Sequence, residues 1–307
     1  MEPAIILSNI SKAYGNVKAV EDISLSVKPG ELFGLIGPDG AGKTTLFRIL
    51  TTLILPDAGT ASISGNDVIK DYKKIRHSVG YMPGRFSLYQ DLTVHENLTF
   101  FATLFGTTIE ENYVLIRDIY EQIKPFSNRR AGKLSGGMKQ KLALSCALIH
   151  KPEVLFLDEP TTGVDAVSRR EFWEMLKKLT ALGITILVST PYMDEAMLCE
   201  RIALIQSGKI LTVDTPENIL DAFPKKLYGA KSSSIYNLLN DFRNLEAVES
   251  CFPFGEWLHI TLKNDDPDPI AALEKYAKTK GHLNVEIKII NPTIEDTFIR
   301  LSTPAPV

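Results

Sequence analysis

The segment at residues 37–44, Gly-Pro-Asp-Gly-Ala-Gly-Lys-Thr, constrains the fold of this 307-residue chain more than any other feature. It fits the pattern G-x-x-x-x-G-K-[ST] and lies between an apolar run at 32–37, which predicts a strand, and a helical pattern at 44–54. Glycines let a backbone wrap closely around an anion, and the N–H groups at a helix start carry partial positive charge. The arrangement therefore predicts a phosphate-binding loop between a strand and a helix.

The residues of this loop are the first candidates for nucleotide contacts. They are Gly37, Pro38, Asp39, Gly40, Ala41, Gly42, Lys43, Thr44 and Thr45. Lys43 is expected to neutralise the β- and γ-phosphates, and the hydroxyl of Thr44 is expected to ligate Mg²⁺. The alternative is a glycine-rich turn with an incidental Lys-Thr pair, which the flanking strand and helix disfavour.

A second strand, expected at 154–158, ends in two adjacent carboxylates. Asp158 is placed to hold Mg²⁺ through water, and Glu159 to polarise an attacking water. Taken alone, the pattern fits a strand that ends in a solvated acidic turn equally well. Together with the phosphate loop it favours catalysis, with Glu159 and Lys43 as the catalytic residues.

The first two thirds of the chain alternate apolar runs with helical stretches. Strands are expected at 5–10, 32–37, 154–158, 185–190 and 201–206, and helices at 44–54 and 168–182. Strands that are apolar on both faces and alternate with helices imply an α/β fold with a mainly parallel sheet, covered on both sides. Residues from about 85 to 150 have helical periodicity and are expected to form a helical subdomain inserted between strands.

The sequence changes character after Thr215-Pro216. From about residue 225 it predicts a short strand, a helix at 235–242, a hairpin through 248–262, a helix at 269–280, a strand at 285–290 and a last helix at 293–301. This tail contains no cluster typical of catalysis. We therefore expect two domains, residues 1–222 and a small α+β domain at 223–307.

Composition excludes several classes of protein. The 34 Lys and Arg against 37 Asp and Glu give a formal charge of −3 without basic blocks, which argues against a nucleic-acid partner. Cys146, Cys199 and Cys251 are odd in number and far apart, so neither a disulfide framework nor a zinc site is expected. The apolar runs are too short to span a bilayer and no secretion signal is visible, so a cytoplasmic location is expected.

A third motif, Leu134-Ser135-Gly136-Gly137-Met138-Lys139-Gln140, precedes the acidic strand by about fifteen residues. With the two nucleotide motifs, it resembles the signature of ABC-type ATPases, in order and at family spacing, over residues 5 to about 220. The details are similar to ATP-binding subunits of multidrug-type ABC exporters, whose late motif YMDEA is found at 192–196. The tail resembles the accessory domain of that group, whose last helix is similar to residues 292–299.

The resemblance implies further roles. Tyr14 falls where the family stacks an aromatic ring on adenine, although a core or turn tyrosine is the alternative. Ser135 would cap the signature helix, and its hydroxyl with the amides of Gly136 and Gly137 would meet the γ-phosphate bound by an opposing subunit. The segment 162–165 resembles the loop that crosses this dimer interface. ATP, with Mg²⁺, would thus lie between two cassettes arranged head to tail, in a homodimer or a heterodimer.

Two positions depart from the family pattern. The family has a glutamine after a strand similar to 79–83, where this chain has Gly84 followed by Arg85. Gln90 lies six residues further on and could not substitute without a rearranged loop. The family also has a histidine after the strand at 185–190, where this chain has Pro191, which lacks a donor.

The resemblance implies an ATPase subunit that couples MgATP binding and hydrolysis to export by a membrane permease, on the cytoplasmic side of the membrane. The departures keep a second hypothesis open, a slowly or non-hydrolysing nucleotide-gated regulator. Because Lys43, Thr44, Asp158 and Glu159 are all present, residual hydrolysis is favoured. Ribosome-associated and chromosome-maintenance ATPases are disfavoured, because the chain has one cassette and no inserted coiled coil or zinc module.

Overall fold

The computed structural model describes residues 2–264 and 267–303. The chain divides into two compact units, residues 1–216 and 217–307, and each is described by itself. The sequence places the boundary at 222/223, whereas the structural division falls at Pro216, the first residue of helix α7 (Pro216–Asp221). None of the helices in the described ranges combines the length and hydropathy of a membrane span.

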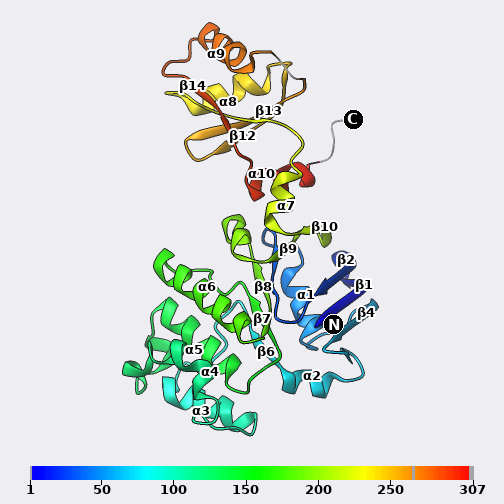
Figure 1. The fold of residues 1–307 in the computed structure, drawn as a ribbon, viewed down its shortest axis with the longest axis vertical. Helices are drawn as coiled ribbons and strands as arrows, with labels where there is room; N and C mark the ends of the chain where they lie inside the picture. Colours follow the sequence, from blue (N-terminus) through cyan, green and yellow to red (C-terminus); the bar gives the residue numbers. More distant parts are fainter. Residues whose placement is uncertain (1, 265–266, 304–307) are drawn as a thin grey trace. The chain divides into compact units, whose positions relative to one another are not determined.

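A six-stranded sheet forms the centre of the first unit, with the strand order β10-β9-β3-β8-β7-β6 (Figure 1). Its strands are β3 (Leu32–Ile36), β6 (Val79–Met82), β7 (Val154–Asp158), β8 (Thr185–Thr190), β9 (Arg201–Gln206) and β10 (Lys209–Asp214). Neighbours pair in parallel except β10, which is antiparallel to β9. Every residue of β3, β7 and β8 is buried, as the apolar runs predicted. The expected α/β fold with a mainly parallel sheet is confirmed.

A second sheet of the first unit is antiparallel and was not predicted as such. Its order is β2-β1-β4-β5, with β1 (Ile5–Tyr14), β2 (Val17–Val27), β4 (Ala58–Ile63) and β5 (Asn66–Asp67). The sequence analysis expected only a strand at 5–10 here. The strands β2, β4 and β5 were missed because they are partly exposed, and β2 alternates buried and exposed residues along its second half.

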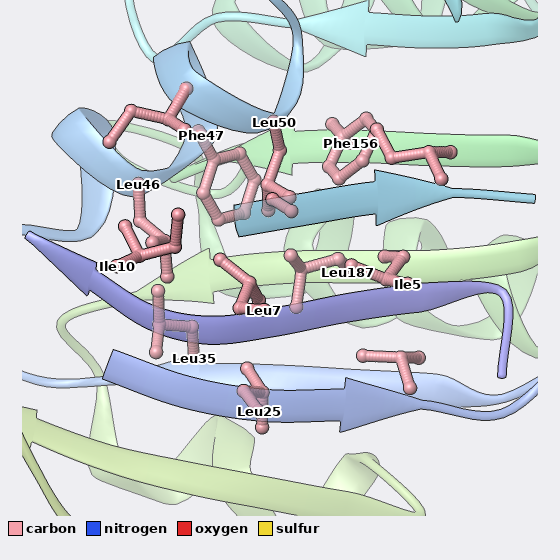
Figure 2. Close-up of a cluster of buried hydrophobic side chains, with 14 of the residues drawn as sticks. Ile5, Leu7, Ile10, Leu25, Leu35, Leu46, Phe47, Leu50, Phe156 and Leu187 are labelled. Carbon is pink, nitrogen blue, oxygen red and sulfur yellow. The ribbon is translucent and has the colours of Figure 1, made fainter. Parts of the chain in front are cut away.

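Helix α1 (Lys43–Leu50) lies within the main core. Figure 2 shows side chains from α1 clustered with residues from strands of both sheets, and Phe47 packs edge-on against Phe156 of β7 with ring centroids 6.0 Å apart. Burying one such ring contributes roughly 1.5–3 kcal/mol. The helix ends four residues before the predicted end at 54, since Thr51 is its C-cap and Thr52 adopts a left-handed φ of 62°.

Residues 85–150 form the predicted helical region. It contains α3 (Val94–Leu104), α4 (Tyr113–Tyr120), the 3₁₀ helices η1 (Lys124–Phe126) and η2 (Ala131–Lys133), and α5 (Gly136–Leu148). Helix α3 begins with a capping box, in which Thr93 and Glu96 satisfy each other's backbone N–H groups. Both α3 and α4 pack against α5. Three further helical elements of the first unit are α2 (Tyr72–Ser78), α6 (Ala166–Ala181) and the 3₁₀ helix η3 (Met193–Leu198).

The second unit is a four-stranded antiparallel sheet with helices, in the order β11 (Leu227–Lys231), α8 (Ile235–Arg243), β12 (Val248–Phe254), β13 (Trp257–Leu262), α9 (Pro269–Thr279), β14 (Glu286–Ile290) and α10 (Ile294–Ser302). The strand order β12-β13-β11-β14 makes this a split βαβ arrangement. Side chains of α8 and α9 share one apolar core with the sheet. The expected α+β tail is confirmed element by element.

Candidate nucleotide-binding site

The loop between β3 and α1 needs glycine at two positions because other backbone segments pass close to it. A Cβ on Gly37 would lie 2.1 Å from the carbonyl oxygen of Ile205. Gly42 has a φ of 104°, and its Cβ would lie 2.3 Å from the carbonyl oxygen of Ala19. The Gly37 N–H also donates to the carbonyl of Thr190 at the end of β8. The neighbouring strands therefore hold this loop at the start of α1, where backbone N–H groups form an anion site.

Lys43 is buried at the first position of α1, with 3% of its side chain exposed. Its Nζ donates to the carbonyls of Gly37 at 2.8 Å and Pro38 at 3.0 Å, and lies 3.1 Å from Oε1 of Glu159. The charge of this lysine is therefore neutralised by the candidate catalytic carboxylate. The structure thus brings together the two residues that the sequence assigns to catalysis.

Asp158 and Glu159 are fixed by Ser189 of the neighbouring strand β8. Asp158 is buried at the end of β7, and its Oδ1 accepts a hydrogen bond from the Ser189 hydroxyl at 2.6 Å. The Glu159 N–H donates to the carbonyl and the hydroxyl of the same serine, both at 3.1 Å. Glu159 adopts a left-handed φ of 49°, which is strained for a residue with a side chain and turns it out of the strand direction.

Asp158 lies in a buried environment, with only 3% of the residue exposed to solvent. Burial, and then the charge of Asp158, raise the pKa of Tyr81 on β6 to about 12, so this tyrosine stays a neutral phenol beside the carboxylate. In the described residues, no three His, Cys, Asp or Glu side chains gather into a metal site. The hydroxyl of Thr44 and the carboxylate of Asp158 nevertheless fit Mg²⁺, which takes one or two protein oxygens and completes its shell with phosphates and water. A magnesium ion would therefore be held jointly with a nucleotide.

The signature segment is built on the first turn of α5. Ser135 is the N-cap, and its Oγ accepts from the N–H of Met138 at 3.4 Å. A Cβ on Gly137 would lie 2.6 Å from Oγ of Ser168, and one on Gly136 would lie 3.3 Å from the carbonyl oxygen of Gly163. The two glycines therefore let α5 pack against the 162–165 loop and the start of α6.

Three of the predicted nucleotide-contact residues are accessible to solvent. Ser135 and Gly136 are exposed, and so is Tyr14, whose side chain is 47% exposed at the end of β1. Among the described residues, Ser135 makes no hydrogen bond to the phosphate loop of its own chain. An exposed helix start with free amides is an anion site that a second molecule can reach.

Comparison with known proteins agrees with this geometry. The sequence family described as "ABC transporter" matches residues 20–162. Nod factor export ATP-binding protein I of Burkholderia orbicola is 36% identical over 96% of this chain and 95% of its own length. The chain belongs to the family of ABC transporter ATP-binding proteins.

A second relative and a solved structure support the same assignment. The probable multidrug ABC transporter ATP-binding protein YbhF of Escherichia coli is 38% identical over 98% of this chain, and the chain spans about half, 52%, of that protein's length. A dimeric ATP-binding cassette solved in a post-hydrolysis state with ADP and Pi superimposes with a TM-score of 0.63 at 27% identity, over 69% of this chain and 98% of that one. The described fold is therefore that of an ABC cassette.

The two departures from the family pattern lie close to the site. A Cβ on Gly84 would be 3.0 Å from the carbonyl oxygen of Asp158, so position 84 lies directly over the acidic strand end but offers no side chain. Gln90 is exposed, and its carbonyl accepts from the N–H of Gly132. Pro191 follows β8 and supplies no hydrogen-bond donor.

The sequence analysis missed one buried carboxylate beside the site. Glu195 of η3 is 1% exposed and accepts hydrogen bonds from the hydroxyls of Thr161 at 2.8 Å and Thr190 at 2.5 Å. The only signal for it was its place in the YMDEA motif, which was used for family resemblance. The ion pair between Lys43 and Glu159 was missed as well, because 115 residues of intervening sequence give no indication of the contact.

Proposed function

We propose that the chain binds and hydrolyses MgATP as the ATP-binding subunit of an ABC exporter. The observation that carries this proposal is the cluster of Lys43, Asp158 and Glu159 at the carboxyl ends of parallel strands, beside the start of α1. Lys43 provides the buried positive charge, and Glu159 has a partly exposed carboxylate within reach of the same space. This combination fits phosphoryl transfer, in which catalysis consists mainly of positioning and charge stabilisation.

The roles of the residues follow from their positions. Amides of the phosphate loop and Lys43 would bind the phosphates, and Tyr14 would stack on the base. Binding of the phosphates would draw Lys43 away from Glu159 and leave that carboxylate to polarise a water molecule. When bound, Mg²⁺ would contribute charge neutralisation, held by Thr44 and Asp158.

A second cassette would complete the site. The exposed N-terminus of α5, with Ser135 and Gly136, offers a hydroxyl and free amides to an anion carried by another subunit. The likeness to a cassette solved as a dimer with ADP and Pi supports a pair of cassettes, which we propose to be arranged head to tail. The partner would be a second copy of this chain or a related cassette.

A groove in the first unit supports a membrane permease as the other partner. It has a volume of about 310 Å³, lies between α3, α5 and the segment after β6, and is lined mainly by apolar side chains such as Leu53, Phe86 and Phe101. Exposed aromatic residues continue this surface, since Phe100 packs edge-on against both Tyr89 and Phe101. A permease docked here would be moved by closure and reopening of the cassettes, and the cassette would lie at the inner face of the membrane.

The direction of transport is proposed from the relatives, whose names describe multidrug transport and Nod factor export. The second unit is proposed to be an accessory domain of this exporter group. A truncation near Lys225 should therefore still bind MgATP but assemble less well with the permease. Loss of nucleotide binding in a folded truncated protein would contradict this division of labour.

Turnover of MgATP by the purified chain tests the enzymatic proposal. Lys43→Ala should abolish binding and turnover, whereas Lys209→Ala, which removes an exposed lysine paired with Glu21, should change neither. Binding without any turnover in the wild type, alone and with its permease, would instead favour the nucleotide-gated regulator.

Docking on the permease is tested by co-purification from native membranes. Leu53→Glu, which places a charge in the groove, should release a polytopic membrane protein that the wild type retains. Leu182→Glu is the matched control, because Leu182 is also an exposed leucine (66% against 56% for Leu53) and lies at the C-terminal end of α6, outside the groove. Equal retention by all three proteins would refute docking at this surface.

A further inference from the structure

The buried carboxylate of Glu195 contacts two segments that border the candidate site, and Arg169 from a third segment lies close to the same carboxylate. Its Oε2 accepts from the hydroxyl of Thr190, the last residue of β8, at 2.5 Å. Its Oε1 accepts from the hydroxyl of Thr161 at 2.8 Å and lies 3.6 Å from Nε of Arg169 on α6. The guanidinium of Arg169 in turn lies 4.2 Å above the ring of Tyr192. One buried carboxylate thus meets the end of β8, the loop after β7 and the first turns of α6.

The end of β8 carries contacts to the phosphate loop. The carbonyl of Thr190 accepts the N–H of Gly37, the first glycine of that loop. The hydroxyl of Thr190, which donates to Glu195, accepts the N–H of Tyr192 at 3.1 Å. Glu195 therefore fixes the turn at Pro191 from the inside.

The loop after β7 carries the candidate base and the segment expected to cross the dimer interface. The N–H of Thr162 donates to the carbonyl of Glu159, and the N–H of Val164 donates to the carbonyl of Thr161. Asp165 then caps α6 by accepting from the N–H of Ser168 at 3.0 Å. This loop is held at one end by Glu195 and at the other by the cap of α6.

The signature segment packs on the same loop. Gly136 faces the carbonyl of Gly163, and Gly137 faces the side chain of Ser168. A continuous series of contacts therefore runs from the signature helix, through the 161–165 loop and Glu195, to Thr190 and Gly37. The signature helix is expected to meet the nucleotide of the opposing subunit, whereas Gly37 belongs to the chain's own phosphate loop.

We propose that Glu195 is a positioning residue for ATP hydrolysis, which holds the 161–165 loop against the end of β8 and thereby sets the orientation of Glu159. The inference rests on the proposed ATPase function. The burial of Glu195 supports it, because a charge removed from water is costly and a well-packed apolar side chain would fill the same space more favourably. Arg169 forms an ion pair with Glu195, but its Nε has no hydrogen-bond partner among the described residues, so the carboxylate depends on the two threonine hydroxyls.

Single-turnover hydrolysis and equilibrium binding of MgATP separate positioning from binding. Glu195→Ala should lower the hydrolysis rate at saturating MgATP by at least about tenfold while the Kd for MgATP changes less than about twofold. Glu195→Gln keeps the shape and one acceptor, so it should recover part of the rate. Thr161→Val should also slow hydrolysis, and adding it to Glu195→Ala should cause no further loss if the two side chains act as one unit.

Glu174→Gln is the control, because it removes a carboxylate from an exposed ion pair with Arg170 on α6 and should change nothing. Amide hydrogen exchange provides a readout that does not need turnover: in Glu195→Ala and Glu195→Gln, the amides of Thr162 and Val164 should exchange faster than in the wild type. The melting temperature of each variant is measured in parallel, and if Glu195→Ala does not fold, Glu195→Gln and Thr161→Val carry the test.

Three results would overturn the inference: hydrolysis within twofold of the wild type in the variants of Glu195, a fall in MgATP affinity as large as the fall in rate, or additive losses with Thr161→Val. A wild type that binds MgATP but never hydrolyses it would refute the proposed ATPase function instead. In that case, hydrogen exchange still tests whether Glu195 holds the 161–165 loop. Unchanged exchange of the loop amides in the Glu195 variants would overturn this role, and faster exchange would support it.

Discussion

Replacing Glu159 by glutamine should raise the affinity for MgATP and lower the rate of hydrolysis. The substitution removes the carboxylate that pairs with Lys43, so bound phosphates would no longer compete with it for the lysine. It also removes the group proposed to polarise the attacking water. We therefore expect tighter binding of MgATP together with loss of turnover.

The size of the first effect follows from the geometry of the pair. At a separation of 3.1 Å and an effective dielectric constant of about 20, the Coulomb attraction is about 5 kcal/mol, which is an upper bound. Desolvation of the lysine and exposure of the glutamate offset most of it, so a net value near the lower end of the roughly 1.5–3 kcal/mol of a charged hydrogen bond is appropriate. About 1.4 kcal/mol corresponds to a tenfold lower Kd. Loss of a general base should reduce turnover by about 10²–10⁴-fold.

The measurement combines equilibrium titration of MgATP, followed by a fluorescent ATP analogue, with turnover at saturating nucleotide. Size-exclusion chromatography of Glu159→Gln with MgATP reports whether an ATP-held dimer accumulates. Glu171→Gln is the matched control, since it breaks a glutamate–lysine pair of 2.7 Å with Lys141 outside the phosphate-binding site. That variant should bind and hydrolyse as the wild type does.

Two results would refute the reasoning, each at a different step. Unchanged hydrolysis in Glu159→Gln would mean that another group activates the water. An unchanged or weaker affinity for MgATP would mean that the ion pair with Lys43 does not oppose nucleotide binding.

Three further predictions concern positions that the structure makes specific. Pro191→His should raise the single-turnover rate at saturating MgATP, because one well-placed donor contributes roughly 2.7–4 kcal/mol to the transition state; no increase would show that another group already fills this role. Gly84→Gln should change the Mg²⁺ concentration needed for half-maximal turnover, although a Cβ 3.0 Å from the carbonyl of Asp158 requires the loop to shift slightly; an identical Mg²⁺ titration would contradict it. In the second unit, burial raises the pKa of Asp296, but hydrogen bonds from His259 and Thr293 outweigh burial and hold that pKa below its ordinary value. Asp296 therefore stabilises the fold at neutral pH, and this contribution disappears as the pH falls through its lowered pKa. Thermal melts of Asp296→Asn should thus show a loss of about 1–2 kcal/mol at pH 7 that shrinks below pH 4, and a pH-independent loss would show that the ionised form has no special role.

The inner strands of the central sheet could be predicted because they are buried on both faces, whereas the edge strand β10 has no fully buried residue and was not predicted. Residues 154–158 and 185–190 are continuous apolar runs, and the matching strands β7 and β8 are buried throughout. The strands β2 and β4 belong to a sheet with an exposed face and carry polar residues at alternate positions, so apolar runs could not reveal them.

The candidate site, too, could be predicted only in part from the sequence. Its motif residues could be predicted from local spacing, because Lys43, Thr44, Asp158 and Glu159 each stand at a strand or helix end. The contacts among them could not, since they depend on how β3, β7 and β8 are ordered in the sheet. Glu195 contacts Thr161 from 34 residues away, and only the fold brings these side chains together.

The glycines of the motifs have a consequence for how such sequences diverge. Gly37 and Gly42 are required by the backbone carbonyls that pass within 2.1 Å and 2.3 Å of their would-be side chains, and Gly137 by the hydroxyl of Ser168. Natural selection would therefore keep them for folding alone, even in a descendant that had stopped hydrolysing ATP. Gly84 and Pro191 stand where the family pattern has polar side chains, and no backbone carbonyl requires a particular residue at Glu159 in the same way. In a descendant that no longer hydrolysed ATP, we therefore expect Glu159 to be replaced before any of these glycines.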